Sequence, residues 1–456
     1  MTHILLTVPF FAYRRSHPDL PDIGLGYLAA CLRDMDVTIT LIDWNNRDTL
    51  KVLAKRLQKR PPGIIAIKCF TINDRATHHS LGFLRGLFPR AVTILGGPHA
   101  SSETPERLLR EFPDVDVILR GEAEPLFRDL VAAAAEGKDS LYSAYGGHNG
   151  LLFPSRRQIN PGLLLTGDLD RLDRPEWPLI DPRAYRSLPI CPTYAGRPLA
   201  PIMATRGCPR PCSFCSVDHV SGPAIRRRSA ASVCAEISWL YRQYQVRQFM
   251  FVDKGFSADR DTLRQVQEHI MRHKLRLCFN MVAGPGFWRT YDADLLKDMR
   301  RAGLASIVFG IESGSDSVRR GHGMDGPIAD VVACVRTVRE LGIGVLGFFM
   351  VGFPGERPED AEKTLALSFS PLFTHVSYEV VVPFPGTRLC DEVQRSEGQA
   401  PDWRRYQRRR HTLPGQVQNS KRLFRLIRKA EIGRLLRTGP RDKHLAKLCV
   451  KYILAI

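Results

Sequence analysis

The stretch Cys208-Pro-Arg-Pro-Cys212-Ser-Phe-Cys215 decides how the rest of the chain is interpreted. It follows a predicted strand at residues 200–205 and a turn at Arg206-Gly207. Three thiolates in one short loop can converge on a single small group, and soft thiolate ligands select zinc or an iron–sulfur cluster. A closed structural zinc site needs a fourth ligand, for which His219 is the one near candidate. The motif therefore indicates either a cluster with one open iron or a zinc knuckle of three cysteines and His219.

Around this motif, residues 197–390 alternate short apolar runs with helix-like stretches. The predicted strands are 200–205, 248–252, 277–282, 306–311, 345–351 and 375–382, and predicted helices include 231–244 and 293–302. Strands that alternate with helices imply right-handed crossovers and a parallel sheet. The six units form either a partial (β/α)6 barrel or a second doubly wound sheet, and periodicity alone cannot choose between them.

The first 135 residues show the same α/β alternation. Strands are predicted at 4–8, 37–42, 64–67, 92–95 and 115–119, with helices at 25–33, 48–59, 76–87 and 105–111. This order predicts a doubly wound parallel sheet, whose ligands bind at the carboxyl ends of the strands. The loops at those ends are Cys69-Phe70-Thr71, Gly96-Gly97-Pro98-His99 and Gly121-Glu122-Ala123-Glu124.

Four parts are therefore expected: a first domain at 1–135, a linker rich in Gly and Pro at 136–196, a second domain at 197–390, and a basic, mainly helical carboxyl-terminal region at 391–456. Residues 404–456 contain sixteen basic and two acidic residues, which accounts for +14 of the net charge of +19. Within them, residues 420–437 are predicted to form a basic amphipathic helix. A general nucleic-acid surface would be expected to spread such charge over the folded domains.

Composition excludes several classes of protein. With 44% hydrophobic and 25% charged residues among 456, the chain is neither disordered nor fibrous. No apolar run is long enough to span a membrane, and the start of the chain is predicted to be a strand and not a signal peptide. Eleven cysteines in a chain of this length without an export signal do not indicate a disulfide scaffold, so a reducing, cytoplasmic setting is expected.

The C-x3-C-x2-C spacing, with Phe214 before its third cysteine, resembles the radical S-adenosylmethionine (SAM) superfamily. The resemblance implies that Cys208, Cys212 and Cys215 hold a 4Fe-4S cluster whose open iron binds SAM. It also implies an external one-electron reductant of the flavodoxin or ferredoxin kind. No side chain is expected to act as a catalytic acid or base.

Segments after the cysteine motif are similar to the SAM-binding segments of that superfamily. They are the strand ending at Asp253, the run Phe309-Gly310-Ile311-Glu312-Ser313-Gly314, the run from Gly347 to Gly355, and the turn Pro383-Phe384-Pro385-Gly386-Thr387. The resemblance implies that SAM contacts Phe214, Asp253, Glu312 and Gly352, with Asp253 at its amino group, Glu312 at its ribose and Gly352 near its adenine.

The amino-terminal domain resembles the cobalamin-binding domain that precedes many radical SAM barrels. The similar stretches are Ile23-Gly24-Leu25-Gly26-Tyr27-Leu28-Ala29-Ala30, Gly96-Gly97-Pro98-His99-Ala100 and Gly121-Glu122-Ala123-Glu124. The implied cobalamin-binding residues are Thr71, Gly96, Gly97, His99 and Glu122. The Asp-x-His-x-x-Gly motif of many cobalamin domains is absent, since the first loop contains only His17. A flavodoxin-like domain without a cofactor is the alternative.

Together the two resemblances imply a class B radical SAM methyltransferase. Such an enzyme methylates an unactivated carbon of a biosynthetic intermediate by way of a 5′-deoxyadenosyl radical and methylcobalamin, and the cofactors supply the difficult chemistry. The same pair of domains also occurs in cobalamin-dependent enzymes that catalyse ring closure or oxidative rearrangement, which is the first alternative.

The basic tail supplies the second alternative, an RNA-modifying radical SAM enzyme like the methylthiotransferases. Those enzymes carry three additional amino-terminal cysteines, whereas only Cys31 and Cys69 lie in the first 150 residues here. The tail could otherwise lie on an anionic membrane surface near a lipid substrate, which would make the protein peripheral to the membrane, or pack against the barrel. A small-molecule or lipid substrate is expected, and a nucleic acid is less favoured.

Overall fold

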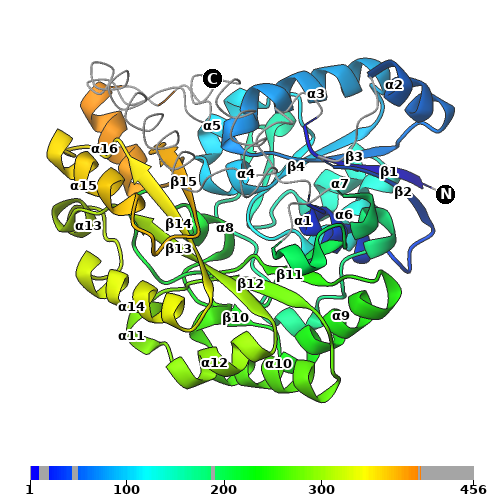
Figure 1. The fold of residues 1–456 in the computed structure, drawn as a ribbon. Coiled ribbons are helices and arrows are strands. Elements are labelled where there is room, and N and C mark those ends of the chain that lie inside the picture. The colour runs from blue at the N-terminus through cyan, green and yellow to red at the C-terminus, as the bar shows by residue number, and fades with distance from the viewer. Residues whose placement is uncertain (1, 10–19, 44–49, 186–189, 399–400, 402–456) are drawn as a thin grey trace.

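The computed structural model describes residues 2–9, 20–43, 50–185, 190–398 and 401, and it shows two α/β units packed against each other (Figure 1). The first unit, blue to cyan in the figure, is built on a seven-stranded sheet. The second, green to orange, is built on a six-stranded sheet. The predicted combination of two parallel-sheet units is confirmed.

The first sheet has the strand order β2-β1-β3-β4-β5-β6-β7. Its strands are β1 (Thr2–Thr7), β2 (Val37–Ile42), β3 (Ile64–Lys68), β4 (Val92–Gly96), β5 (Val117–Leu119), β6 (Leu151–Phe153) and β7 (Gln158–Ile159). The first five strands are parallel, and β6 and β7 add an antiparallel edge. Ile4, Leu5 and Leu6 are all fully buried, as expected for a parallel strand covered on both faces.

The helices of the first unit cover both faces of its sheet. They are α1 (Ile23–Ala30), α2 (Leu50–Lys59), α3 (Asp74–Leu87), α4 (Pro98–Ser102), α5 (Pro105–Glu111), α6 (Glu124–Glu136) and α7 (Lys138–Tyr145). Because β2 and β3 flank β1 on opposite sides, the right-handed crossovers run in opposite directions and place helices on both faces. The strand order therefore reverses beside β1, which is where such sheets bind ligands.

Residues 136–196, expected to be a linker, contain more structure than that. Besides α7, β6 and β7 they form several single-turn 3-10 helices, among them Trp177–Ile180. Trp177 is fully buried, and its ring N–H donates to Glu236 at 3.1 Å. A Cβ on Gly26 of α1 would lie 2.6 Å from Ile180 and 2.9 Å from Pro175, so that glycine lets the segment dock on α1. This stretch thus fastens the two units together.

The strand order of the second sheet distinguishes a partial barrel from a second doubly wound sheet. Its strands are β8 (Leu199–Ile202), β11 (Gln248–Phe251), β12 (Cys278–Val282), β13 (Leu304–Glu312), β14 (Gly344–Val351) and β15 (His375–Val380). All six are parallel and adjacent in chain order. Each right-handed crossover therefore moves in the same direction and leaves its helix on the same face. That is the topology of a partial (β/α)6 barrel.

The helices outside the barrel complete the second unit. They are α8 (Val217–Ser221), α9 (Ala230–Gln243), α10 (Arg260–Arg272), α11 (Phe287–Thr290), α12 (Ala293–Arg301), α13 (Asp316–Gly321), α14 (Ile328–Glu340), α15 (Pro358–Ser368) and α16 (Arg388–Glu397). A short antiparallel pair, β9 (Thr205–Arg206) and β10 (Arg226–Arg227), brackets the cysteine motif.

Side chains alternate along the barrel strands with the period of two expected for β structure. In β14, Val345, Phe349 and Val351 are buried in the core between sheet and helices, whereas Phe348 is 43% exposed although it is large and apolar. Val252, directly after β11, is also 43% exposed. The face of the sheet that points away from the helices is therefore accessible at these positions.

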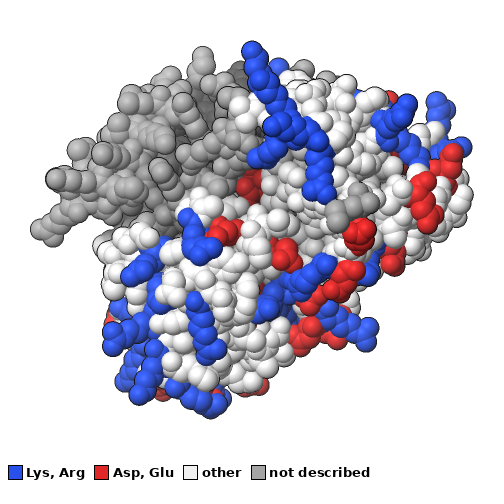
Figure 2. Space-filling model, turned by 90° about the vertical axis from the view of Figure 1, so that its right-hand side faces the viewer, with Lys and Arg blue, Asp and Glu red and all other residues white. Residues whose placement is uncertain are grey.

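None of the described helices is long and apolar enough to cross a membrane. On the face shown in Figure 2, basic and acidic side chains both occur among the described residues. The helix predicted at 420–437, like nearly all of the basic tail, lies outside the described residues.

Candidate functional site

The cysteine motif occupies a loop between β9 and α8, beyond the end of the first barrel strand. Cys208 is buried, and Cys212 and Cys215 are half-buried. Gly207 starts the loop with φ +90°, and a Cβ there would lie 2.0 Å from the carbonyl oxygen of Ala224. Only glycine fits this approach, which explains the Arg206-Gly207 turn before the first cysteine.

The loop is held from outside by the segment that follows α13. Ser213 donates its backbone N–H to the carbonyl of His322 at 3.0 Å, and its hydroxyl lies 2.8 Å from Nδ1 of that histidine. The thiol of Cys212 approaches the carbonyl oxygen of Gly323 at 3.5 Å. Phe214 packs edge-on against Phe353, with the ring centroids 5.5 Å apart. The loop is thus anchored by residues far along the chain.

The three thiols share one electrostatic environment. Burial, and then the neighbouring Cys215 and Cys208 groups, raise the pKa of Cys212 to about 11. The three sulfur atoms do not all lie within 4.8 Å of one another among the described residues. A single tetrahedral zinc ion with Zn–S bonds of about 2.3 Å would need a closer set. The donor set therefore fits a larger, thiolate-bound cluster better than the zinc knuckle.

Lys254 lies beside the thiols, and Glu312 lies beside Lys254. Burial lowers the pKa of Lys254, but the surrounding Cys215, Glu312, Cys208 and Cys212 groups outweigh that effect and raise it. Burial raises the pKa of Glu312 to about 7, although Lys254 and Arg319 act in the opposite direction. The interior of the barrel next to the cysteine loop therefore presents one basic and one acidic group.

Glu312 lies on a distorted end of β13. Its φ is +59°, and the pairing register with β14 shifts between Gly310 and Glu312. A Cβ on Gly310 would lie 2.6 Å from a carboxylate oxygen of Glu312, so the side chain folds over that glycine. Bulges and positive φ values of this kind re-aim side chains at functional sites.

Asp253 is held by the protein itself. Its carboxylate accepts hydrogen bonds from the backbone N–H of Ala204 at 2.7 Å, the hydroxyl of Thr205 at 2.5 Å and the backbone N–H of Phe256 at 2.9 Å. These bonds join the end of β11 to the strand that leads into the cysteine loop. Its predicted contact with the SAM amino group stays a prediction, and the structure gives it a bracing role.

Gly352 begins the turn after β14 with φ +91°. Its N–H and that of Phe353 both donate to a carboxylate oxygen of Glu356, at 2.5 and 3.2 Å. Burial raises the pKa of Glu356 to about 7, and these two hydrogen bonds only partly offset it. The predicted adenine-binding turn is therefore shaped by a carboxylate of its own.

The strand ends of the first sheet carry the predicted cobalamin residues. Gly97 follows β4 with φ +99°, and a Cβ there would lie 2.9 Å from the carbonyl oxygen of Cys69. Gly96 has nothing closer than 3.8 Å at the equivalent position, so this strand end is open to close approach by a ligand. The pair of small residues fits a bulky corrinoid at this edge.

Thr71 and His99 do meet, but below that surface. His99 is fully buried, with Nδ1 3.1 Å from the hydroxyl of Thr71 and Nε2 3.3 Å from a carboxylate oxygen of Glu111. Both ring nitrogens therefore have partners within the domain. The edge fits a corrinoid that receives no imidazole from His99.

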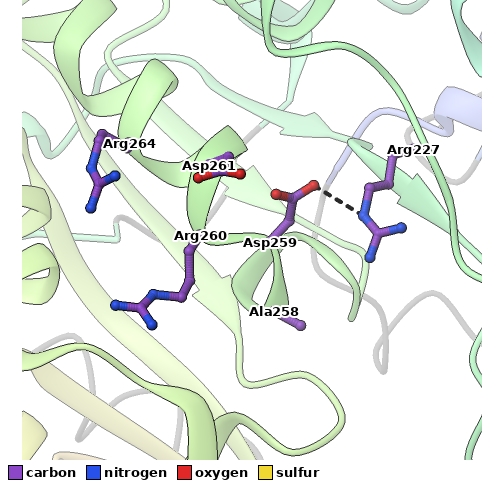
Figure 3. Close-up of a pocket in the computed structure, with 6 residues that line it drawn as sticks. All are labelled: Arg227, Ala258, Asp259, Arg260, Asp261 and Arg264. Atoms are coloured by element: carbon purple, nitrogen blue, oxygen red, sulfur yellow. Dashed lines mark ion pairs between the residues drawn. The ribbon is translucent and has the colours of Figure 1, made fainter.

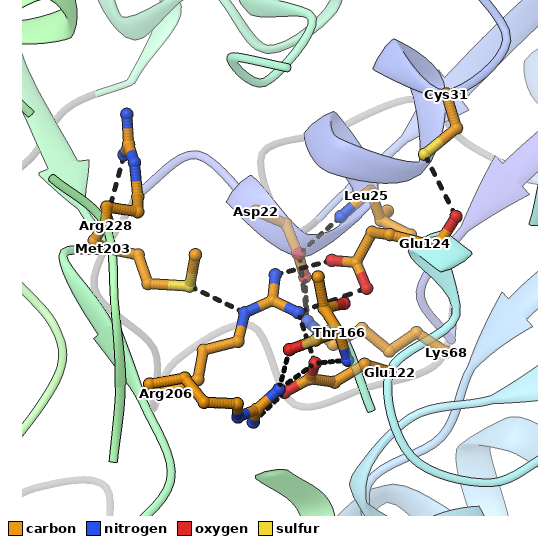
Figure 4. A network of polar contacts seen from close by, with 11 residues as sticks. Asp22, Leu25, Cys31, Lys68, Glu122, Glu124, Thr166, Met203, Arg206 and Arg228 are labelled. Atoms are coloured by element: carbon orange, nitrogen blue, oxygen red, sulfur yellow. Dashed lines mark hydrogen bonds and ion pairs between the residues drawn. The ribbon is translucent and has the colours of Figure 1, made fainter. Parts of the chain in front are cut away.

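The loop after β5 joins the two units instead of ending in an open pocket (Figure 4). Glu122 pairs with Arg226 at 2.7 Å and with Arg206 at 3.2 Å, and it accepts from the backbone N–H of Thr166 at 2.7 Å. Glu124 accepts two hydrogen bonds from Arg206, at 2.6 and 3.2 Å. The predicted cobalamin role of Glu122 stays a prediction, and its charge is matched by two arginines.

This network fixes how the two candidate sites face each other. Arg206 is two residues before Cys208, and Glu122 follows the carboxyl end of β5 in the first sheet. The α4 helix that follows Gly97 also packs against α8, which follows the cysteine loop. The ligand-binding edge of the first sheet therefore adjoins the cysteine loop.

A separate surface depression of about 620 Å³ lies outside the barrel (Figure 3). It is lined by Arg227, Ala258, Asp259, Arg260, Asp261 and Arg264, around the start of α10. Arg227 pairs with Asp259 at 3.0 Å, so part of its charge is already matched. Its lining includes neither the three cysteines nor Lys254 and Glu312.

Comparison with known proteins agrees with this geometry. The sequence profile of the radical SAM superfamily matches residues 202–368, and that of the B12 binding domain matches residues 13–131. The chain therefore combines an amino-terminal B12-binding domain with a radical SAM domain, and it is a radical SAM enzyme. Its cofactors are a 4Fe-4S cluster, SAM and cobalamin, as predicted from the sequence.

Relatives in sequence include an uncharacterized methyltransferase, PH0819, of Pyrococcus horikoshii, 27% identical over 91% of this chain and 88% of its own length. Another is the cytidylyl-2-hydroxyethylphosphonate methyltransferase of Streptomyces wedmorensis, 25% identical over 83% of this chain and 79% of its own.

Solved structures share the fold. The radical SAM methyltransferase TsrM from Kitasatospora setae, with cobalamin and cluster bound, matches with a TM-score of 0.68 at 20% identity. The match covers 88% of this chain and 76% of the TsrM chain. The cobalamin-dependent enzyme OxsB has a TM-score of 0.75 at 16% identity and covers 100% of this chain and 71% of its own.

Lys254, His322 and the pairing of Arg206 with Glu124 were not predicted from the sequence. Lys254 could have been found, since counting by two from Val252 places residue 254 toward the barrel interior. His322 lies more than a hundred residues from Ser213, and no local pattern marks it. The Arg206 pair joins two domains, and its partners are set by how the domains pack.

Proposed function

We propose that this protein is a cobalamin-dependent radical SAM methyltransferase that methylates an unactivated carbon of a small biosynthetic intermediate. The observation that carries the proposal is the closeness of the two cofactor edges. Through Arg206, Glu122 and Glu124, the strand ends of the B12-binding domain are fixed beside the loop of Cys208, Cys212 and Cys215. A methyl carrier and a radical source must both reach one substrate, and this packing supports that requirement.

When bound, the cofactors supply reductive cleavage of SAM at the cluster and a methyl group carried by cobalamin. The three cysteines would hold the cluster, and Phe214 would form part of the adjoining wall. SAM carries an ammonium and a carboxylate group, which complement the charges of Glu312 and Lys254 in the barrel interior. Gly352, in the turn shaped by Glu356, would lie near the adenine.

The cobalamin edge would consist of Gly96 and Gly97, with Thr71 and His99 supporting it from below. Glu122 would act through its arginine pairs, by holding the loop after β5 against the barrel. Among the described residues His99 has both nitrogens engaged, so no protein imidazole from this loop is assigned to cobalt.

A small organic substrate is supported by the accessible, partly apolar barrel interior. Val252 and Phe348 expose apolar surface there, next to the charged pair. The sequence relatives include a methyltransferase of a cytidylyl phosphonate, and a structure of TsrM contains tryptophan. An external one-electron reductant of the flavodoxin or ferredoxin kind would be needed. The predicted membrane and nucleic-acid contacts of the basic tail fall outside the described residues.

A second function is favoured by one comparison. The anaerobic magnesium-protoporphyrin IX monomethyl ester cyclase of Cereibacter sphaeroides is 26% identical over 85% of this chain, although only 62% of its own length is covered. A cobalamin-dependent cyclase or oxidative rearrangement enzyme is therefore the alternative. The two reactions differ in the fate of the SAM methyl group.

The products from SAM distinguish the two. The reconstituted enzyme, with reductant and a panel of small candidate substrates, would be supplied with methyl-labelled SAM under anaerobic conditions. A methyltransferase should yield S-adenosylhomocysteine together with 5′-deoxyadenosine and a labelled product. 5′-Deoxyadenosine with a converted but unlabelled substrate would support the cyclase alternative and refute methyl transfer.

A further inference from the structure

A buried cluster of potential metal ligands lies within the B12-binding domain, away from the cysteine loop. Asp74 begins α3, His99 lies on α4 and Glu111 ends α5. One ligand atom from each lies within 4.8 Å of the other two, and within the described ranges this is the one such set of three. Three separate helices thus present nitrogen and oxygen donors to a single point.

The ligand atoms are withdrawn from solvent. His99 is 0% exposed and Asp74 is 3% exposed. Oδ1 of Asp74 and Nε2 of His78 are buried and form an ion pair at 3.1 Å, one turn from each other on α3, but neither atom makes a hydrogen bond. A cation bound beside them would give both atoms a further partner.

The histidine is oriented as a metal ligand usually is. Nδ1 of His99 lies 3.1 Å from the hydroxyl of Thr71 and can donate a hydrogen bond to it. A cation would replace the present contact of Nε2 with Oε2 of Glu111, 3.3 Å away, and bind both atoms. Metal-bound histidines commonly fix their tautomer through such a second hydrogen bond.

The donor set also suits a cation. Arg107 pairs with Oε1 of Glu111 at 2.6 Å and contacts Glu103 at 3.5 Å. Asp74 and Glu111 supply two carboxylates at this point, and carboxylate and imidazole donors together form a set that a divalent cation can bind.

We propose that Asp74, His99 and Glu111 bind one divalent transition-metal cation, with His78 available as a fourth ligand. Imidazole and carboxylate donors together suit zinc among the common divalent metals. The site is closed, so its role would be structural. The cation would fasten α3, α4 and α5 beneath the Gly96–Gly97 end of the corrinoid edge. This inference does not rest on the proposed function.

The test measures the binding of zinc. It uses a full-length background variant in which Cys208, Cys212 and Cys215 are replaced by Ala, because those thiolates would also bind zinc. Equilibrium dialysis followed by elemental analysis should find about one zinc ion per chain. Asp74→Asn and His99→Gln in this background should weaken zinc binding by about tenfold or more. Glu106→Gln, an exposed carboxylate on α5, is the matched control and should bind as the background does.

Thermal unfolding distinguishes a loss of zinc binding from a failure to fold. Zinc should raise the unfolding temperature of the background and of Glu106→Gln, and should not raise that of Asp74→Asn. If His99→Gln fails to fold, Glu111→Gln replaces it, since Glu111 is only half-buried. Absence of bound zinc in the background, or equal binding in Asp74→Asn and the background, would overturn the proposal.

Discussion

Replacing Arg206 with Met should loosen the joint between the B12-binding domain and the barrel. The side chains of Arg206, Glu122 and Glu124 are only 10%, 5% and 7% exposed. Removing one partner of a buried ion pair costs about 3–5 kcal/mol, because the remaining charge stays buried. Glu122 keeps Arg226, whereas Glu124 loses both of its hydrogen bonds to Arg206. A domain of about 200 residues shifts by about 2–4 °C per kcal/mol, so a drop of about 10 °C is expected.

Thermal unfolding with bound iron and corrinoid held constant measures this effect. Adding Glu124→Leu to Arg206→Met should recover part of the lost stability, because the unpaired carboxylate is removed as well. The control is Arg260→Met, whose ion pair with Asp292 is more exposed and should be worth about 1 kcal/mol or less. The reasoning is refuted if Arg206→Met costs no more than Arg260→Met, or if the double variant is no more stable than the single one.

Three further predictions concern the cysteine loop and the turn after β14. Cys212→Ala should abolish the formation of 5′-deoxyadenosine and reduce the amount of iron bound. Unchanged cleavage of SAM would refute the cluster assignment. His322→Leu removes the contact with Ser213 at 2.8 Å and should speed the loss of iron to a chelator several-fold. The control is His269→Leu, which breaks a similar 2.7 Å contact with Ser238 away from the loop and should leave the rate of iron loss unchanged. Burial raises the pKa of Glu356 from 4.5 to about 7, so the native state binds its proton more tightly than the unfolded state. This group therefore contributes to the free energy of unfolding at low pH, on the order of 2 kcal/mol, and the contribution is lost as the pH rises from about 5 to 7. Glu356→Gln should remove this part of the pH dependence of the unfolding temperature, and identical pH profiles would contradict it.

The strands were predictable because their apolar runs are continuous and bounded by turn residues. The strand at 37–42 and the helix at 105–111 have the predicted ends. Periodicity could not choose between a partial barrel and a second doubly wound sheet, since both use the same alternation. The order of β8 and β11 to β15 decides it, and that order depends on long-range pairing.

The place of the three cysteines in one loop after the first barrel strand was predictable from the local motif, and their role as cluster ligands stays a prediction. The site was less predictable where a polar residue has several possible partners. Asp253 and Glu122 lie at strand ends as expected, but the structure joins the first to Thr205 and the second to Arg226. Such pairings depend on which chain segments pack together, and the sequence pattern alone does not show this.

The most direct test of the central claim is the cofactor content of the reconstituted protein. After anaerobic incubation with iron, sulfide and hydroxocobalamin, and removal of unbound material, iron and corrinoid would be quantified in the same sample. A cobalamin-dependent radical SAM enzyme should retain about four irons and about one corrinoid per chain. Retention of iron without corrinoid would contradict the cobalamin assignment, and with it the proposed methyl transfer.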